Sequence, residues 1–247
     1  MSPCLSRFFL PVLIGLIVLP ASVRGQASER SNASDARILV DDFETYRPGE
    51  LPVKWHAQFN GELVPLTRDF VNEREWYEVR AEYGNHFVRA HAQGEAAHVA
   101  MANGKDFNWN TRTHPILAWD WRAVELPAGA REDVERLNDS GAGIYVMFAI
   151  EGVLLKRPRV IKYVYSTSLP VGTVVTYGKL KVVVVASGAD GIGRWQHVER
   201  NVMEDHQRLF GEPPPVKPLV VRLWADSDNT DSRATVDFDN VVLLKAN

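Results

Sequence analysis

Short runs in which apolar and polar residues alternate follow one another from residue 37 onwards, separated by Gly, Pro, Asn or Asp. Many of the runs are rich in Val, Ile, Tyr, Phe and Trp, which suit the pleated, half-buried surface of a β-strand. We therefore expect strands at residues 37–40, 76–79, 86–90, 98–101, 116–124, 144–150, 160–165, 180–185, 219–225 and 234–244. This spacing, with turn signals in between, predicts an all-β fold, an antiparallel β-sandwich or jelly roll.

One segment has a helical period instead. Residues 199–210 place apolar side chains on one face of a helix, and Gly211 followed by three prolines stops it. We expect one amphipathic crossover helix there, packed on the edge of the sandwich. For residues 131–137 a shorter helix and a loop are equal alternatives. The apolar helix positions are Val202, His206, Leu209 and Phe210.

The N-terminus has the layout of a secretory signal peptide. Arg7 precedes an apolar run from Phe8 to Leu19, and small residues follow up to Gly25. The run is shorter than the roughly 20 residues that a membrane span needs, so an uncleaved anchor is the lesser alternative. We predict a signal peptide at 1–25, a flexible polar leader at 26–36 and a single β-sandwich domain at 37–247. The mature protein would be secreted or periplasmic, with no membrane insertion after cleavage.

Charge and cysteine content exclude several partners and chemistries. The chain has a formal net charge of −3 and one cysteine, Cys4, which lies in the predicted signal peptide. Such a balance has neither the basic footprint of a nucleic-acid-binding protein nor a polybasic membrane patch. The mature domain would have no disulfide and no thiol chemistry.

Strand alternation places polar residues together on sheet faces. In residues 116–122, Leu117, Trp119 and Trp121 share one face, which we expect in the core, and Asp120 and Arg122 share the other. The same alternation sets further polar or aromatic residues opposite apolar ones. These candidates for ligand binding are Arg89, Asp120, Arg122, Tyr145, Arg222 and Trp224, with Lys162 in a similar position.

Such a face has two interpretations. It is either a solvated sheet surface with cross-strand ion pairs, or a groove that binds a carbohydrate or similar polar ligand, which is the function we favour. A glycan-cleaving enzyme, a hydrolase or a lyase, could use the same face, with Asp120 and either Asp226 or Glu204 as paired carboxylates. A structural or interaction module of the cell envelope is the third alternative. No standard catalytic motif decides between them.

Residues 225–240, ADSDNTDSRATVDFDN, are rich in aspartate. Asp226 and Asp228 are candidates for ligand binding, and clustered oxygens also suit calcium. The EF-hand pattern fails, because Asp231 replaces the required glycine and Asp237 the required glutamate. A hydrogen-bonded turn is the commoner role for Asp, Asn and Ser in such a loop.

Two short motifs resemble carbohydrate-binding jelly rolls. Residues 40–44, VDDFE, and residues 236–241, VDFDNV, are similar to the first and last strands of such folds. In those folds the two strands lie side by side and often share a structural calcium ion. The resemblance implies Glu44 and Asp239 as the metal ligands.

The chain from about residue 41 to 244 also resembles an uncharacterised family of secreted bacterial proteins, domain of unknown function 3047. The segments that carry this resemblance are NDSGAGIYV at 138–146, YVYSTSLPVG at 163–172, ERNVMED at 199–205 with LFGE at 209–212, and ADSDNT at 225–230. The family implies an exported β-sandwich and no particular activity.

Overall fold

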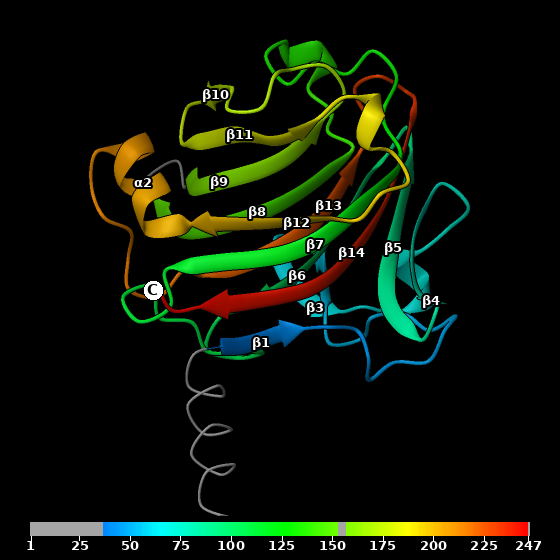
Figure 1. Cartoon of the computed structure of the whole chain (residues 1–247), viewed down its shortest axis with the longest axis horizontal. Helices are drawn as coiled ribbons and strands as arrows, with labels where there is room; N and C mark the ends of the chain where they lie inside the picture. Colours follow the sequence, from blue (N-terminus) through cyan, green and yellow to red (C-terminus); the bar gives the residue numbers. More distant parts are fainter. Residues whose placement is uncertain (1–36, 153–156, 247) are drawn as a thin grey trace, which may run out of the picture.

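The computed structural model describes residues 37–152 and 157–246 (Figure 1). The predicted signal peptide and the predicted leader both lie outside the described residues. Within them, two β-sheets stack face to face as the layers of a sandwich, and one α-helix lies at one end (Figure 1). The all-β sandwich prediction is therefore confirmed. No helix among the described residues is long and apolar enough to cross a membrane.

Sheet A has six strands and contains both ends of the described chain. Its order is β12 (Gln196–Asn201), β7 (Ile116–Glu125), β14 (Arg233–Leu244), β5 (Asn85–Gln93) and β4 (Glu75–Glu82), and β1 (Arg37–Asp41) also pairs with β14. All its pairings are antiparallel. The first and last strands therefore lie side by side, as the resemblance to jelly rolls implies.

Sheet B has eight strands and is mixed. Its order is β10 (Val174–Tyr177), β11 (Leu180–Ser187), β9 (Arg157–Ser166), β8 (Ala142–Glu151), β13 (Val220–Asp226), β6 (Ala96–Ala102), β2 (His56–Phe59) and β3 (Glu62–Pro65). The pair β11–β9 is parallel, whereas the sequence predicts a purely antiparallel sandwich. The return loop after β9 carries the short β10 strand, so that β11 re-enters the sheet in the same direction as β9.

The core lies between the sheets and contains the tryptophans that the alternation predicts. Trp119 and Trp121 of β7 are fully buried. Their rings approach two tyrosines of sheet B, with ring centroids 5.7 Å apart for Trp119–Tyr163 and 5.9 Å apart for Trp121–Tyr165. Large aromatic groups dominate the packing of such a core. Because side chains alternate along a strand, the predicted polar residues next to these tryptophans point away from the core.

Helix α2 (Val202–Phe210) is shorter than the predicted 199–210. Residues 199–201 belong to β12 and pair with β7, and the side chain of Asn201 caps the helix by accepting a hydrogen bond from the N–H of Glu204. Gly211 ends the helix with φ +80°, as predicted. Sheet pairing at the edge of β7 therefore overrides the helical periodicity of the first residues.

The expected strands are all present, and four short ones are additional. β2, β3, β10 and β12 have four to six residues each, and residues 199–201 of β12 fall within the predicted helix. Residues 131–137 form a loop with a 3-10 turn at Glu135–Leu137 and no α-helix. This segment joins β7 to β8, and its turn is too short to show a helical period.

Candidate functional site

The candidate residues divide between two outer faces on opposite sides of the sandwich. Arg89, Asp120 and Arg122 lie on the outer face of sheet A, in strands β5 and β7. Tyr145, Arg222, Trp224 and Asp226 come from β8 and β13 of sheet B. The buried tryptophan core separates the two groups, so Asp120 and Asp226 cannot act on the same bond of a substrate.

On sheet A the polar residues form cross-strand ion pairs. The carboxylate of Asp237 in β14 is fully buried between Arg89, whose Nε lies 2.6 Å away, and Arg122, whose Nη2 lies 2.7 Å away. Arg122 also donates to Glu82 at 2.6 Å. Asp120 accepts from His197 at 2.7 Å and from Asn240 at 2.9 Å. This part of the face is thus the salt-bridged sheet surface that was one of the two interpretations.

A cavity of about 440 Å³ opens over the same face. It brings together three predicted residues, Asp120, Arg122 and Asp239, and several that sequence reasoning missed. Its lining consists of Glu82, Tyr83, Asn85, Phe87, Asp120, Arg122, Trp195, Asp239 and Asn240. Carboxylates, amides and a guanidinium therefore share one hollow with aromatic rings.

Two aromatic rings of this cavity, those of Trp195 and Tyr83, come from loops and are exposed, whereas Phe87 lies in β5 and is buried. Trp195, just before β12, is 37% exposed and packs edge-on against Phe87, while the guanidinium carbon of Arg122 lies 4.9 Å from its ring centroid. Tyr83 sits in the two-residue turn between β4 and β5, with φ +53°, and is completely exposed. A lone tryptophan in a polar stretch between two strands was the sequence signal for this site.

The predicted calcium ligands lie at the edge of this cavity. Burial raises the pKa of Asp239 to about 6, and the charges of Asp120 and Glu44 add to this effect. Asp239 accepts hydrogen bonds from Asn85 and from its neighbour Asn240. Glu44 accepts from the backbone N–H of His86 at 2.9 Å. Calcium binding by Glu44 and Asp239 stays a prediction.

On sheet B, aromatic rings stack across three neighbouring strands. The Trp224 ring lies between Tyr145, with centroids 4.6 Å apart, and His98 of β6, with centroids 4.2 Å apart. Burial raises the pKa of Tyr145 to about 12. The rings stack on one another, and the indole nitrogen of Trp224 and Nε2 of His98 are buried within the row. His98 was missed because an isolated histidine in a strand has no distinguishing pattern.

A buried ion pair lies beside this row. Lys162 of β9 is 2% exposed, and its Nζ lies 3.1 Å from Asp226 Oδ2 and 5.1 Å from the centroid of the Tyr145 ring. Burial raises the pKa of Asp226 to about 6 although Lys162 opposes the shift, and Asp139 and Asp228 add to it. The lysine therefore supplies the positive charge at this end of the sheet.

The aspartate-rich loop is a hydrogen-bonded turn. Asp139, which is fully buried, accepts hydrogen bonds from both the backbone and the side chain of Asn229 and of Thr230. Oxygens of Asp139, Asp226 and Asp228 lie within 4.8 Å of one another, the one such trio among the described residues. With its oxygens already bonded to the loop and to Lys162, the trio has a structural role.

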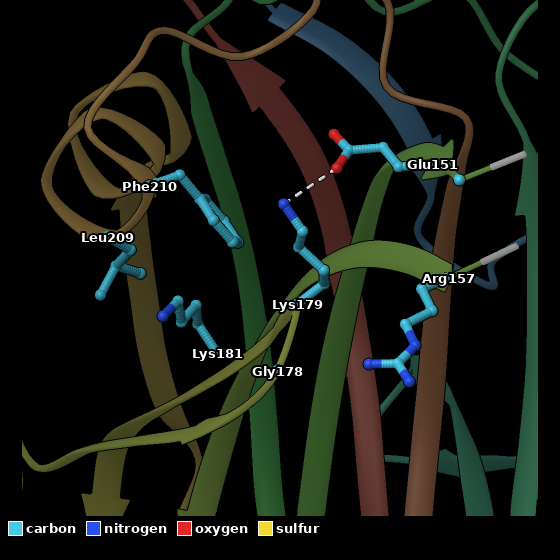
Figure 2. A pocket seen from close by; sticks show the side chains of 8 residues that line it. Glu151, Arg157, Gly178, Lys179, Lys181, Leu209 and Phe210 are labelled. Carbon is cyan, nitrogen blue, oxygen red and sulfur yellow. Dashed lines mark ion pairs between the residues drawn. The ribbon is translucent and has the colours of Figure 1, made fainter. Parts of the chain in front are cut away.

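A second cavity, of about 550 Å³, is basic and lies between β9, β11 and α2. Figure 2 shows Lys179 pointing to Glu151, at 3.1 Å, with Phe210 and Leu209 of α2 across the hollow. Arg157 and Lys181 complete the charged lining (Figure 2). None of the predicted site residues lies here.

Comparison with known sequences identifies the family. The family model described as "Protein of unknown function (DUF3047)" matches residues 67–242, so the chain belongs to this family. The resemblance found in the sequence motifs is thereby confirmed. No curated protein matches the chain.

Several solved structures are similar in fold. The family 11 carbohydrate-binding module of cellulosomal cellulase Lic26A-Cel5E of Clostridium thermocellum is 8% identical with a TM-score of 0.43, over 85% of this chain and 95% of that one. The family 30 carbohydrate-binding module of a cellulosomal cellulase of the same organism is 14% identical with a TM-score of 0.39, over 85% and 98%. A family 11 xylanase from Neocallimastix patriciarum is 11% identical with a TM-score of 0.36, over 71% and 94%. Likeness at this level does not distinguish a binding module from an enzyme.

Proposed function

We propose that this protein is an exported β-sandwich that binds a carbohydrate through the cavity on the outer face of sheet A. The observation that carries the proposal is the exposed Trp195 ring beside Asp120 and Arg122 in one hollow. The carbon face of a sugar ring is apolar and packs on an aromatic side chain, whereas its hydroxyls need polar partners. This cavity offers both within about 440 Å³, room for a short saccharide.

The polar groups of the cavity are well held before any ligand arrives. Arg122 is fixed by Asp237 and Glu82, and Asp120 by His197 and Asn240. Side chains held in this way lose little conformational entropy when they bind. They supply a rigid set of donors and acceptors below the exposed rings.

The experiment is a screen of the purified protein against a glycan array, followed by titration calorimetry on each hit. Trp195→Ala and Tyr83→Ala are expected to weaken binding at least tenfold. Trp76→Ala is the matched control, because Trp76 lies on the same face in β4, stacked on His91 and outside the cavity. Absence of any glycan ligand, or equal binding by all three variants and the wild type, would refute the proposal.

Glycan cleavage is the second candidate function, and one observation favours it. Asp239 and Asp120 are in register on neighbouring strands within the cavity, and the pKa of Asp239 is raised to about 6. Glycosidases use a carboxyl group of raised pKa as the acid and a second carboxylate near it as the base or nucleophile. Release of reducing ends from a bound glycan, lost in Asp239→Asn, would establish an enzyme. Binding without release would leave a carbohydrate-binding protein.

Export is part of the proposal and rests on the apolar run from Phe8 to Leu19. Expression of the full chain in a bacterial host, followed by cell fractionation and N-terminal sequencing, tests it. A processed product that starts near residue 26 outside the cytoplasm is the expected result. An unprocessed cytoplasmic chain would contradict it.

A further inference from the structure

Arg222, in the centre of sheet B, is a buried arginine without a counter-ion. It is 7% exposed, and its one hydrogen bond runs from Nη1 to Oε1 of the neutral Gln58, at 2.6 Å. Its Nε is buried and has no partner among the described residues, and no carboxylate there forms an ion pair with it. Burial lowers the pKa of Arg222, which reflects the cost of holding this charge away from water.

Other little-exposed cations in the described parts of the chain are paired. The side chains of Arg122 and Arg159 are 13% and 12% exposed, and each contacts two carboxylates. Lys162, on the same face as Arg222, pairs with Asp226. A buried charge normally needs such a partner, because desolvation without compensation strongly disfavours the fold. Among the four little-exposed cations compared in the described residues, Arg222 is the one without a carboxylate partner.

The groups around Arg222 also have unused hydrogen-bonding capacity. His98 Nδ1 faces the carbonyl oxygen of Ala96 at 3.1 Å, which makes Nδ1 the donor and leaves Nε2 as an acceptor without a partner. The indole N–H of Trp224 has no acceptor either. Buried polar atoms are nearly always satisfied. Three buried polar atoms without partners, Arg222 Nε, His98 Nε2 and Trp224 Nε1, therefore indicate a binding site for a polar group.

A cavity of about 330 Å³ lies at the edge of sheet B, and Gln58, the hydrogen-bond partner of Arg222, connects it to the guanidinium, which does not itself line the cavity. Gln58, His98 and Tyr77 all line it. Tyr77 is 2% exposed, and its hydroxyl group has no hydrogen-bond partner among the described residues. Asp69 and Glu75 contribute carboxyl groups. Burial and the neighbouring Glu95 raise the pKa of Glu75 to about 7, so near neutral pH this group is partly protonated and can donate a hydrogen bond to an anion.

We propose that Arg222, with Gln58 and His98, forms a second binding site, which takes the oxyanion group of an acidic saccharide, a carboxylate or a sulfate ester. The planar guanidinium matches an oxyanion in a two-pronged hydrogen bond. The free Nε and the Nη1 now given to Gln58 supply the donors. His98 Nε2 accepts from a sugar hydroxyl. Saccharide as the ligand class rests on the proposed function, whereas the anion site itself rests on Arg222.

The test is titration calorimetry of the purified protein at low ionic strength with sodium glucuronate, with glucose as the neutral match and sodium sulfate as the anion without a sugar. Glucuronate is expected to bind saturably and at least tenfold more tightly than glucose or sulfate. Equal binding of glucose overturns the anion site. Binding of sulfate as tight as that of glucuronate overturns the saccharide part of the proposal.

Gln58→Glu gives a test that does not depend on removing the arginine. Gln58 is exposed, so the variant is expected to fold, and its new carboxylate pairs with Arg222. The expected result is a higher melting temperature without ligand and at least a tenfold loss of glucuronate affinity. Gln93→Glu, which adds the same charge at an exposed position at the end of β5, is the control and should change neither. Unchanged affinity in Gln58→Glu overturns the proposal.

The outcomes of the two proposals separate cleanly. Trp195→Ala is expected to leave glucuronate binding intact, because Trp195 lies over sheet A. Glucuronate binding together with the absence of any glycan binding that depends on Trp195 or Tyr83 would refute only the sheet A site. Neutral glycan binding that is sensitive to Trp195, without glucuronate binding, would refute only the Arg222 site.

Discussion

Asp139 Oδ2 accepts two hydrogen bonds from Thr230, one from the backbone N–H at 2.8 Å and one from the hydroxyl at 2.5 Å. The two residues come from different loops, one before β8 and one between β13 and β14. Their contact holds the aspartate-rich loop closed at the end of sheet B. It turns a sequence that looks like a metal loop into a hydrogen-bonded turn.

We expect Asp139→Ala to destabilise the protein by about 3 kcal/mol, because hydrogen bonds to a buried charged acceptor contribute about 1.5–3 kcal/mol and buried donors are left without partners. Urea unfolding followed by tryptophan fluorescence measures this loss. Asp228→Ala is the control, since Asp228 is exposed and its carboxylate accepts a hydrogen bond from the side chain of the adjacent Asn229. Similar losses in both variants would contradict the role given to Asp139.

Glu75 predicts a pH dependence of stability. Its pKa in the folded protein is raised to about 7, chiefly by burial, from an ordinary value of 4.5. A group with a raised folded-state pKa contributes stability that is fully present below the unfolded pKa and is lost as pH rises through the folded pKa. Glu75→Gln should therefore match the wild type near pH 4 and exceed its unfolding free energy by about 2 kcal/mol at pH 8. Thermal melts across this range test it, and a constant difference at all pH values would contradict the assignment.

Asp205 connects helix α2 to both sheets. Its carboxylate accepts from Arg200 of β12 at 2.7 Å and from Tyr163 of β9 at 3.0 Å, and it is 3% exposed. Asp205→Ala leaves the half-buried Arg200 and the buried hydroxyl of Tyr163 without their acceptor, at a cost of about 3 kcal/mol. Chemical denaturation should show this loss, whereas Glu204→Ala at the exposed helix start should cost about 1 kcal/mol through its lost capping contact. A smaller loss of unfolding free energy for Asp205→Ala than for Glu204→Ala would contradict the role of Asp205 in connecting α2 to the two sheets.

The calcium prediction has a direct test in thermal unfolding with EDTA and then with added calcium. An ion that binds only the folded state at about 100 times its Kd adds about 2.7 kcal/mol. If Glu44 and Asp239 hold the ion, the rise in melting temperature should disappear in Asp239→Asn. It should persist in Asp228→Asn, because Asp228 belongs to a separate group of carboxylates, which lies beside Lys162 at the end of sheet B. If calcium does not raise the melting temperature of the wild type, the prediction of a calcium site is wrong.

The sequence by itself determined which side of each long strand is buried. The alternation in residues 116–124 separates Trp119 and Trp121 from Asp120 and Arg122, and the structure confirms that separation. Gly211 likewise marks the end of α2 from local chemistry alone. Such features depend on side-chain period and on backbone conformation within a few residues, so they can be predicted without knowing the partners.

Only the tertiary structure decided which polar faces belong together. Asp120 and Asp226 look equivalent in the sequence, yet they lie on opposite sides of the sandwich because β7 and β13 belong to different sheets. Trp195 meets Arg122, and Arg222 meets Gln58, through pairings between distant segments. A period of two describes one strand at a time, whereas the choice of neighbouring strands depends on packing across the whole core. For that reason the missing counter-ion of Arg222 becomes visible only in the folded chain.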